Sequence, residues 1–234
     1  MRLISDKTGM YKVRPYYEEG EIDSICEKIL TDFLLKTTGR VKFPISTECI
    51  EILIENHVED LDSHADLTKE GTNIDGMTEF NINTKPNVYI SKHLAEGKLE
   101  NRRRTTLTHE FGHVILHQCL WKELAQQEQF FKTENIAFRC KRENIIHAKQ
   151  YDWKEWQAGY ASGAFLMPIT YIRGVVNEVH NLIKSDDPIY INSNWGIGLV
   201  TRVKKAFSVS GDAARVRLCQ LGFATNNETL DLTK

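Results

Sequence analysis

The amino-acid sequence predicts an α+β fold: a mostly helical domain with a small antiparallel sheet and a helical C-terminal tail. Apolar residues recur at helical three- and four-residue steps over most of the chain, and they alternate with polar residues only between Gly71 and Ser91. The 234 residues, 41% of them hydrophobic, suffice for one globular core. We expect residues 1–168 to form this core. We expect residues 169–234 to form a helical region packed on it, with a surface that could dock a partner.

Composition limits the cellular compartments and the kinds of binding partner that we expect for the protein. The formal net charge is −2, so no overall field attracts the chain to nucleic acid or to an acidic membrane surface. No run of 18 apolar residues is present, and the first residues lack the apolar stretch of a signal peptide. Five scattered cysteines without a C-x-x-C pair argue against a secreted disulfide framework. We therefore expect a cytoplasmic protein with no membrane segment and no direct binding to nucleic acid.

The first half of the chain predicts two helices followed by the sheet. Helical periodicity runs from about Glu18 to Lys36, and a second apolar pattern follows Ser46. In the sheet region, Asp75-Gly76 and Pro86 are turn signals. The alternating apolar positions around these turns are Phe80, Ile82, Val88 and Ile90.

The predicted strand from Asn87 to Ser91 is a candidate sheet edge. An extended peptide could add as a further strand beside such an edge. A covered strand explains the same alternation equally well.

The second half of the chain is predicted to be helical apart from one insertion. Helical spacing returns at about Thr105, whereas Gln118 to Asp152 is polar, aromatic and weakly periodic, with room for one helix. A strong helix follows from Trp153 to Leu166 and stops before Pro168. The tail predicts three more helices, at about Tyr171–Lys184, Trp195–Phe207 and Asp212–Leu221.

Residues Thr108 to His117 read T-H-E-F-G-H-V-I-L-H and carry the strongest functional signal. On a helix, His109 and His113 lie one turn apart, opposite an apolar face, with Glu110 at the edge of their side. Two imidazoles at i and i+4 can bind one metal ion, and the glutamate beside the first can act as base on a water molecule at that metal. An ordinary half-buried helix would instead expose a mixture of Lys, Glu and Gln. The pattern therefore predicts a zinc site.

The number of ligands decides between a structural and a catalytic site. A structural zinc site uses four protein ligands, whereas a hydrolytic site uses three and leaves the fourth position to water, whose pKa zinc can lower to about 7. Glu110 would take the proton of this water as it attacks a carbonyl, and would pass it to the leaving amine. The chain is then a metal-dependent hydrolase.

The third ligand is predicted on the helix that begins at Trp153. Glu155 shares one helical side with small residues that would let a neighbouring helix come close. Asp152 and His147 are rival ligands. His117 lies on the same helix as His109, and one straight helix cannot easily wrap three ligands around one ion. We expect His117 to contact a ligand, face the substrate or end in solvent.

Three further features have competing explanations. Tyr160, His147 and Tyr151 are candidates for a group that polarises the substrate carbonyl, and packing or surface positions are the alternative for each. The run Arg102-Arg103-Arg104 could steer an acidic substrate, although a solvated charge run is favoured. The basic tail from Asn194 to Phe223 could form a helix-turn-helix or dock a partner protein, but packing on the core is favoured.

Two motifs together resemble the ImmA/IrrE family of metallopeptidases. H-E-F-G-H-V-I-L-H (His109 to His117) is followed downstream by E-W-Q-A-G-Y-A-S-G-A-F-L-M-P (Glu155 to Pro168). The tail V-S-G-D-A-A-R-V-R-L-C-Q-L-G (Val209 to Gly222) is similar to the usual end of the family, and the order of predicted elements also resembles it. The chain departs from the family at Gly159, where Asn or Asp is usual, and at Gln157, where Glu is frequent.

The resemblance implies a zincin-like catalytic domain in which His109, His113 and Glu155 hold Zn²⁺ and Glu110 is the general base. It also implies a cytoplasmic endopeptidase whose substrate is a helix-turn-helix transcriptional repressor of a mobile element, prophage or stress regulon. Gly159 and the long insertion motivate an alternative, a non-proteolytic zinc-containing module that antagonises a repressor or another partner stoichiometrically. A DNA-binding regulator that uses the tail is a further alternative, against which the slightly acidic composition argues.

Overall fold

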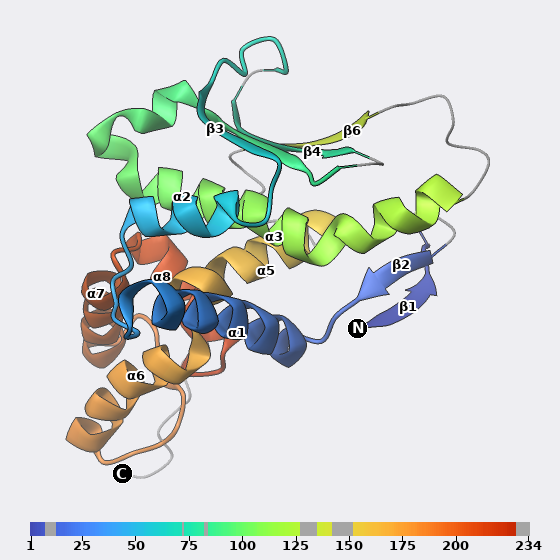
Figure 1. Ribbon diagram of the computed structural model, residues 1–234. Coiled ribbons are helices and arrows are strands. Elements are labelled where there is room, and N and C mark those ends of the chain that lie inside the picture. Colours follow the sequence, from blue (N-terminus) through green and yellow to red (C-terminus); the bar gives the residue numbers. More distant parts are fainter. Residues whose placement is uncertain (8–12, 72, 82–83, 127–134, 142–151, 228–234) are drawn as a thin grey trace.

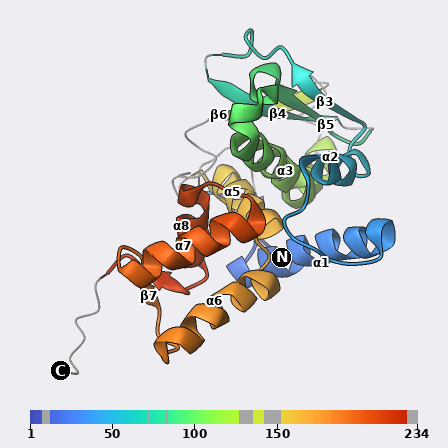
Figure 2. The ribbon, with the colours of Figure 1, turned by 90° about the vertical axis from the view of Figure 1, so that its left-hand side faces the viewer.

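The computed structural model of the chain places a four-stranded sheet over one long central helix, α3 (Figure 1). The structure describes residues 1–7, 13–71, 73–81, 84–126, 135–141 and 152–227, and of residues 119, 121–126 and 135–141 it describes the backbone only. Helix α5 packs along α3, and α1 packs against α5 (Figures 1 and 2). Helices α6, α7 and α8 gather beside this group, away from the sheet (Figure 2). The predicted α+β class is confirmed.

The elements have the following bounds. The sheet strands are β3 (Asp60–Ala65), β4 (Ile74–Asn81), β5 (Asn87–Ser91) and β6 (Asn135–Lys141). The helices are α1 (Glu19–Thr38), α2 (Thr47–Glu55), α3 (Glu100–Gln126), α5 (Trp153–Leu166), α6 (Ile169–Ile183), α7 (Asn194–Phe207) and α8 (Gly211–Gln220), with 3₁₀ turns η1 (Lys92–Ala95) and η2 (Gly97–Leu99). Two short strand pairs complete the structure, β1 (Arg2–Ser5) with β2 (Val13–Tyr16) and β7 (Ile189–Tyr190) with β8 (Ala224–Thr225).

Local signals fix the two N-terminal helices where the sequence predicts them. Glu18 and Glu21 form a reciprocal capping box at the start of α1, and Gly39 ends this helix with a left-handed φ of 71°. The Ser46 side chain accepts a hydrogen bond from the Cys49 N–H at 3.1 Å and so caps α2. The hairpin of β1 and β2, which precedes α1, was not predicted, because its short strands lack an alternating apolar pattern.

The sheet is larger than predicted and is not entirely antiparallel. Its strand order is β3-β5-β4-β6, with β3 and β5 parallel and the other two pairs antiparallel. Phe80, Val88 and Ile90 are buried, as their alternation predicts, whereas Ile82 lies outside the described residues. Strand β5 is covered on both sides by neighbouring strands. Of the two explanations that the sequence leaves open for Asn87–Ser91, the covered strand is the one that the structure shows.

The pair Asp75-Gly76 lies inside β4, so the predicted turn at this position is wrong. The pairing of β4 with β6 shifts register between Ile74 and Gly76, which leaves Asp75 as an additional residue in a β-bulge. A glycine inside a strand often marks such a bulge or a close approach of another element, and both conditions hold at Gly76. Asp75 and Gly76 therefore allow β4 to contact α3, and they do not reverse the direction of the chain.

The described residues of the predicted insertion form two regular elements. Helix α3 continues into it as far as Gln126, and β6 adds Asn135–Lys141 to the sheet beside β4. Residues 127–134 and 142–151 lie outside the described residues. Among the described residues of the insertion, the end of α3 is helical as predicted, and the strand was missed.

The four helices that follow the insertion lie where the sequence predicts them. Ser193 and Ser210 cap α7 and α8 through hydrogen bonds from the N–H groups of Gly196 and Ala213. One hydrophobic cluster contains buried residues from each of the α-helices described above, so the C-terminal helices share the core of the chain. The division at residue 168 stays a prediction. None of the helices in the described ranges combines the length and apolar character that a bilayer crossing requires.

Candidate metal centre

Small side chains bring α3 and α5 close together. A Cβ at Gly112 of α3 would lie 3.0 Å from the Ala158 backbone of α5, so only glycine fits there without displacement. The hydroxyls of Thr108 and Ser162 lie 2.8 Å apart, and Ser162 also donates to the Thr105 carbonyl at 3.1 Å. The small residues that follow Glu155 therefore allow the close helix packing that the sequence suggests.

His109, His113 and Glu155 meet at this helix interface. Their ligand atoms lie within 4.8 Å of one another, and this group could hold a metal ion. His109 Nε2 lies 3.2 Å from Glu155 Oε2, and His113 Nε2 lies 3.3 Å from Glu155 Oε1. A tetrahedral zinc ion with bonds of about 2.0–2.1 Å separates its ligand atoms by roughly 3.3 Å. The two measured distances agree with that spacing, and the donor set of two imidazoles and one carboxylate suits zinc.

The group is buried and electrostatically coupled. Both imidazoles are fully buried, and Glu155 is 6% exposed. Burial opposes the charge of Glu155, but the neighbouring His113 and hydrogen bonds from both imidazoles hold the Glu155 pKa well below its usual range. Burial likewise opposes the charge of His113, but the attraction of Glu155 raises the pKa of this imidazole above 6.5. A bound cation would replace these protons as the partner of the carboxylate.

Glu110 lies beside this group, fully buried between α3 and β4. The Thr78 hydroxyl of β4 donates a hydrogen bond of 2.6 Å to Glu110 Oε2. Glu110 Oε1 has no hydrogen-bond partner among the described residues. Burial raises the Glu110 pKa above 4.5, and the two histidines and the Thr78 hydrogen bond act against this rise. One oxygen of the carboxylate is thus anchored and the other is available to accept a proton.

The close approach of β4 to Glu110 depends on Gly76 and on the bulge beside it. A Cβ at Gly76 would lie 2.5 Å from Glu110 Oε1 and 2.8 Å from Thr106 Cγ2, so no other residue fits without displacing them. The fully buried Asp75 accepts hydrogen bonds from Arg102 Nε and Nη2 at 2.6 and 2.5 Å. This bidentate pair joins β4 to the first turns of α3.

The three arginines at the start of α3 therefore have neither of the roles expected from the sequence. Arg102 pairs with Asp75, and Arg103 pairs with Glu51 at 2.6 Å. Arg104 is 3% exposed and donates to the carbonyls of Ile45 and Phe207. All three side chains are used inside the protein, so they form neither a solvated run nor a steering surface.

His117 does not end in solvent but contacts a predicted ligand. It is fully buried, and its Nδ1 lies 3.0 Å from His113 Nδ1. Its Nε2 lies 2.9 Å from Oε1 of Gln157, whose Nε2 donates to the Pro15 carbonyl at 3.1 Å. Burial lowers the His117 pKa well below 6.5. His117 is not in the group of possible ligands found among the described residues.

The other candidates from the sequence lie elsewhere. The Tyr160 hydroxyl donates to Asp23 of α1 at 2.9 Å, and the ring packs against Arg217, which gives this tyrosine a role in core packing instead of a substrate-facing one. Asp152 precedes α5 and is not among the possible ligands in the described part of the chain. His147 and Tyr151 lie outside the described residues.

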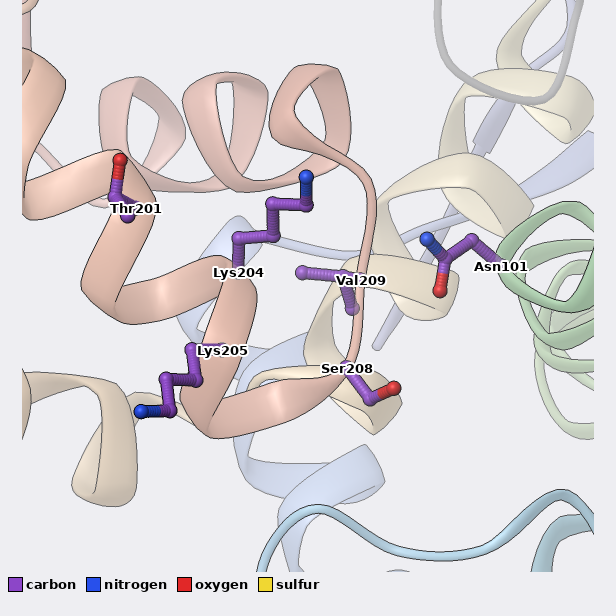
Figure 3. Close-up of a pocket in the computed structure, with 6 residues that line it drawn as sticks. All are labelled: Asn101, Thr201, Lys204, Lys205, Ser208 and Val209. Atoms are coloured by element: carbon purple, nitrogen blue, oxygen red, sulfur yellow. The ribbon is translucent and has the colours of Figure 1, made fainter.

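A surface hollow of about 370 Å³ lies apart from this centre, between the start of α3 and the end of α7. It is lined by Asn101, Thr201, Lys204, Lys205, Ser208 and Val209 (Figure 3). The side chains of Lys204 and Lys205 leave α7 in different directions (Figure 3). The hollow contains none of the residues of the metal centre and no converging set of donors.

Sequence reasoning missed the residues that hold the centre in place. Thr78, Gly76 and Asp75 lie on a strand whose contact with α3 no local pattern reveals. Gln157 is visible in the sequence only as a departure from the ImmA/IrrE motif. A polar residue two positions after a candidate ligand on a buried helix is the signal that could have drawn attention to it.

Comparison with known families supports the character of this centre. Residues 64–219, more than half of the chain, match the family model Peptidase_M78, described as the IrrE N-terminal-like domain. The matched range contains α3, α5 and every residue of the buried group. No curated protein matches the chain.

Proposed function

Because the chain belongs to the Peptidase_M78 family, we propose that it is a zinc-dependent endopeptidase that cleaves a regulatory protein. The observation that carries the proposal is the buried group of His109, His113 and Glu155 beside Glu110. The proposed substrate is a helix-turn-helix repressor of a mobile element, prophage or stress regulon, in a cytoplasmic setting. The resemblance of the two motifs to the ImmA/IrrE family supports this choice of substrate.

The residues of the chain have distinct roles in the proposed reaction. His109, His113 and Glu155 would hold the ion, each through one ligand atom. Zinc, when bound, polarises the scissile carbonyl and lowers the pKa of water. Glu110 Oε1 accepts the proton of the attacking water and delivers it to the departing amine. The Thr78 hydrogen bond keeps Glu110 Oε2 engaged, so the carboxylate presents the same oxygen throughout.

Two substitutions test the assignment of ligand and base. Glu155→Ala should lower the zinc content sharply, since a site with two imidazoles alone binds zinc weakly. Glu110→Gln should keep zinc and abolish cleavage, because the amide accepts no proton. Elemental analysis gives zinc per chain, and mass spectrometry of a candidate repressor gives the fragments. Glu178→Gln, on the exposed side of α6, is the control and should change neither result.

The burial of all four side chains favours a second function, that of a zinc-containing module that binds a partner without cleaving it. The same experiment separates the two. An intact repressor in a stable stoichiometric complex, with zinc present, would support the module. Fragments that accumulate with time and disappear with Glu110→Gln would support the peptidase.

A further inference from the structure

A chain of three hydrogen bonds connects the N-terminal hairpin to one of the proposed zinc ligands. Its links run from the Pro15 carbonyl to Gln157 Nε2 (3.1 Å), from Gln157 Oε1 to His117 Nε2 (2.9 Å) and from His117 Nδ1 to His113 Nδ1 (3.0 Å). Gln157, His117 and His113 are all buried. We propose that Gln157 and His117 are positioning residues that fix His113 in the tautomer whose Nε2 binds the metal. This inference rests on the metal-binding part of the proposed function.

The backbone of β2 determines which group donates and which accepts in each of the three hydrogen bonds. A proline carbonyl can only accept a hydrogen bond, so the Gln157 group that faces it must be the amide NH₂. The amide oxygen of Gln157 therefore faces His117, and because this oxygen can only accept, His117 Nε2 carries a proton.

The same order of donors and acceptors extends from His117 to His113 at the metal centre. A fully buried imidazole favours its neutral form, and a neutral ring protonated at Nε2 has a lone pair at Nδ1. His117 Nδ1 then accepts from His113 Nδ1–H across 3.0 Å. With a proton held at Nδ1, His113 is left with Nε2, which lies 3.3 Å from Glu155 Oε1, as the nitrogen that can bind the metal.

Glutamine is better suited to this position than the glutamate that is frequent in the ImmA/IrrE motif. A carboxylate at residue 157 could accept from His117, but its second oxygen would face the Pro15 carbonyl without a proton between them. The amide satisfies both neighbours, and it joins β2 to the metal centre. His109 has no such support, because its Nδ1 has no hydrogen-bond partner among the described residues.

Zinc affinity tests the role of Gln157 without any substrate. We expect Gln157→Leu to weaken zinc binding by about 10–100-fold, as loss of a partner of a metal ligand typically does. Gln157→Glu should retain most of the affinity, because it keeps the acceptor for His117, while lowering stability against unfolding through its contact with Pro15. The measurement is competition with a chromophoric zinc chelator.

Ser162→Ala is the matched control, since it removes a buried hydrogen bond between α5 and α3 without touching the chain to His113. It should leave zinc affinity unchanged. Equal affinities in wild type and Gln157→Leu would overturn the proposal, as would equal losses in Gln157→Leu and Ser162→Ala.

A second measurement holds even if Gln157→Leu does not fold. Nitrogen-15 chemical shifts of the imidazoles report the tautomer directly in the wild-type protein, with and without zinc. We expect a proton on His113 Nδ1 and on His117 Nε2 in both samples. Coordination of zinc through His113 Nδ1, or a metal-free His113 protonated only at Nε2, would overturn the proposal. A protein with the expected tautomers that cleaves nothing would contradict the proposed peptidase activity alone.

Discussion

The two oxygens of Glu110 have different surroundings, and this difference defines a single productive orientation. Oε2 accepts the Thr78 hydrogen bond at 2.6 Å, whereas Oε1 lies against the bare backbone of Gly76. A carboxylate held at one oxygen needs less reorganisation to accept a proton at the other. The absence of a side chain at residue 76 is therefore as much a part of the centre as the hydroxyl of Thr78.

Gly76→Ala tests this geometry. The new Cβ would lie 2.5 Å from Glu110 Oε1 and 2.8 Å from Glu110 Cγ, so the carboxylate must move. We expect a loss of about 1–3 kcal/mol in the free energy of unfolding and a fall of about 10²-fold in the rate of repressor cleavage. Zinc content should stay at the wild-type level, because the clash does not involve a ligand.

Gly174→Ala is the control for this substitution. Residue 174 lies on the exposed side of α6, and a methyl group there would have no atom within 4 Å, so alanine should stabilise the helix by roughly 0.5–1 kcal/mol. Urea unfolding and elemental analysis check both variants. A Gly76→Ala protein that cleaves the repressor at the wild-type rate would contradict the proposed position of the Glu110 carboxylate against Gly76.

The raised pKa of His113 predicts how zinc affinity depends on pH. Zinc requires the neutral imidazole, and in the metal-free protein Glu155 holds the proton on His113 to a pH above 6.5. Affinity should therefore be full at higher pH and fall as the pH drops through this raised pKa. Glu155, with its lowered pKa, stays ionised over the same range and adds no second step.

Calorimetric titration with zinc in buffers of different ionisation enthalpy measures this proton release. We expect zinc binding to release a proton from His113, and this release to grow as the pH falls through the raised pKa of His113. Proton release that does not change with pH would mean that the pair of His113 and Glu155 is not coupled as the distances indicate.

At the scale of elements, the sequence predicts helices well because their signals are local. The bounds of α5 agree with the prediction at both ends, and α1, α2, α6, α7 and α8 agree within a few residues. Capping residues and apolar periodicity lie inside each segment, so no knowledge of the remaining chain is needed. The spacing of His109, Glu110 and His113 is local in the same sense, which is why this motif could be recognised from the sequence.

The sheet could not be predicted to the same extent, because strand pairing joins distant residues. Strand β5 has the alternation of a half-buried strand whether it lies at an edge or between β3 and β4. Strand β6 lies in a segment with weak periodicity and is recognised only by its register with β4. An Asp-Gly pair is a turn signal in isolation, and only the contact with Glu110 shows why it occurs in a strand.

The same distinction separates the proposed ligands from their supporting residues. Glu155 was predicted because its own helix carries the small residues that allow α3 to approach. Thr78 and Gln157 act through neighbours that are 32 and 40 positions away along the chain, so their roles follow only from the folded structure. Polar residues of this kind have no sequence signature of their own.

At the scale of the whole molecule, one buried ion pair connects the two ends of the chain. Arg217 of α8 is 1% exposed, pairs with Asp23 of α1 and donates to the Met167 carbonyl at 3.2 Å. Tyr160 of α5 donates to the same carboxylate at 2.9 Å, and its ring lies 5.2 Å from the Arg217 guanidinium. The N-terminal helix, the helix of Glu155 and the C-terminal helix therefore share one polar network inside the core.

This network predicts that the chain unfolds as a unit. It also predicts that removing one charge of the Asp23–Arg217 pair lowers the free energy of unfolding more than removing both charges. Arg217→Met leaves Asp23 buried without its counter-charge, which should cost about 3–5 kcal/mol of unfolding free energy. The double variant Asp23→Leu/Arg217→Met removes both charges and should recover much of this loss. Urea unfolding followed by circular dichroism and by tryptophan fluorescence should give one coincident transition in each protein. Two separate transitions would mean that the network does not unite the core and that residues 1–168 and 169–234 unfold as independent units. A double variant less stable than Arg217→Met would mean that the cost of the single variant does not come from an unpaired buried charge.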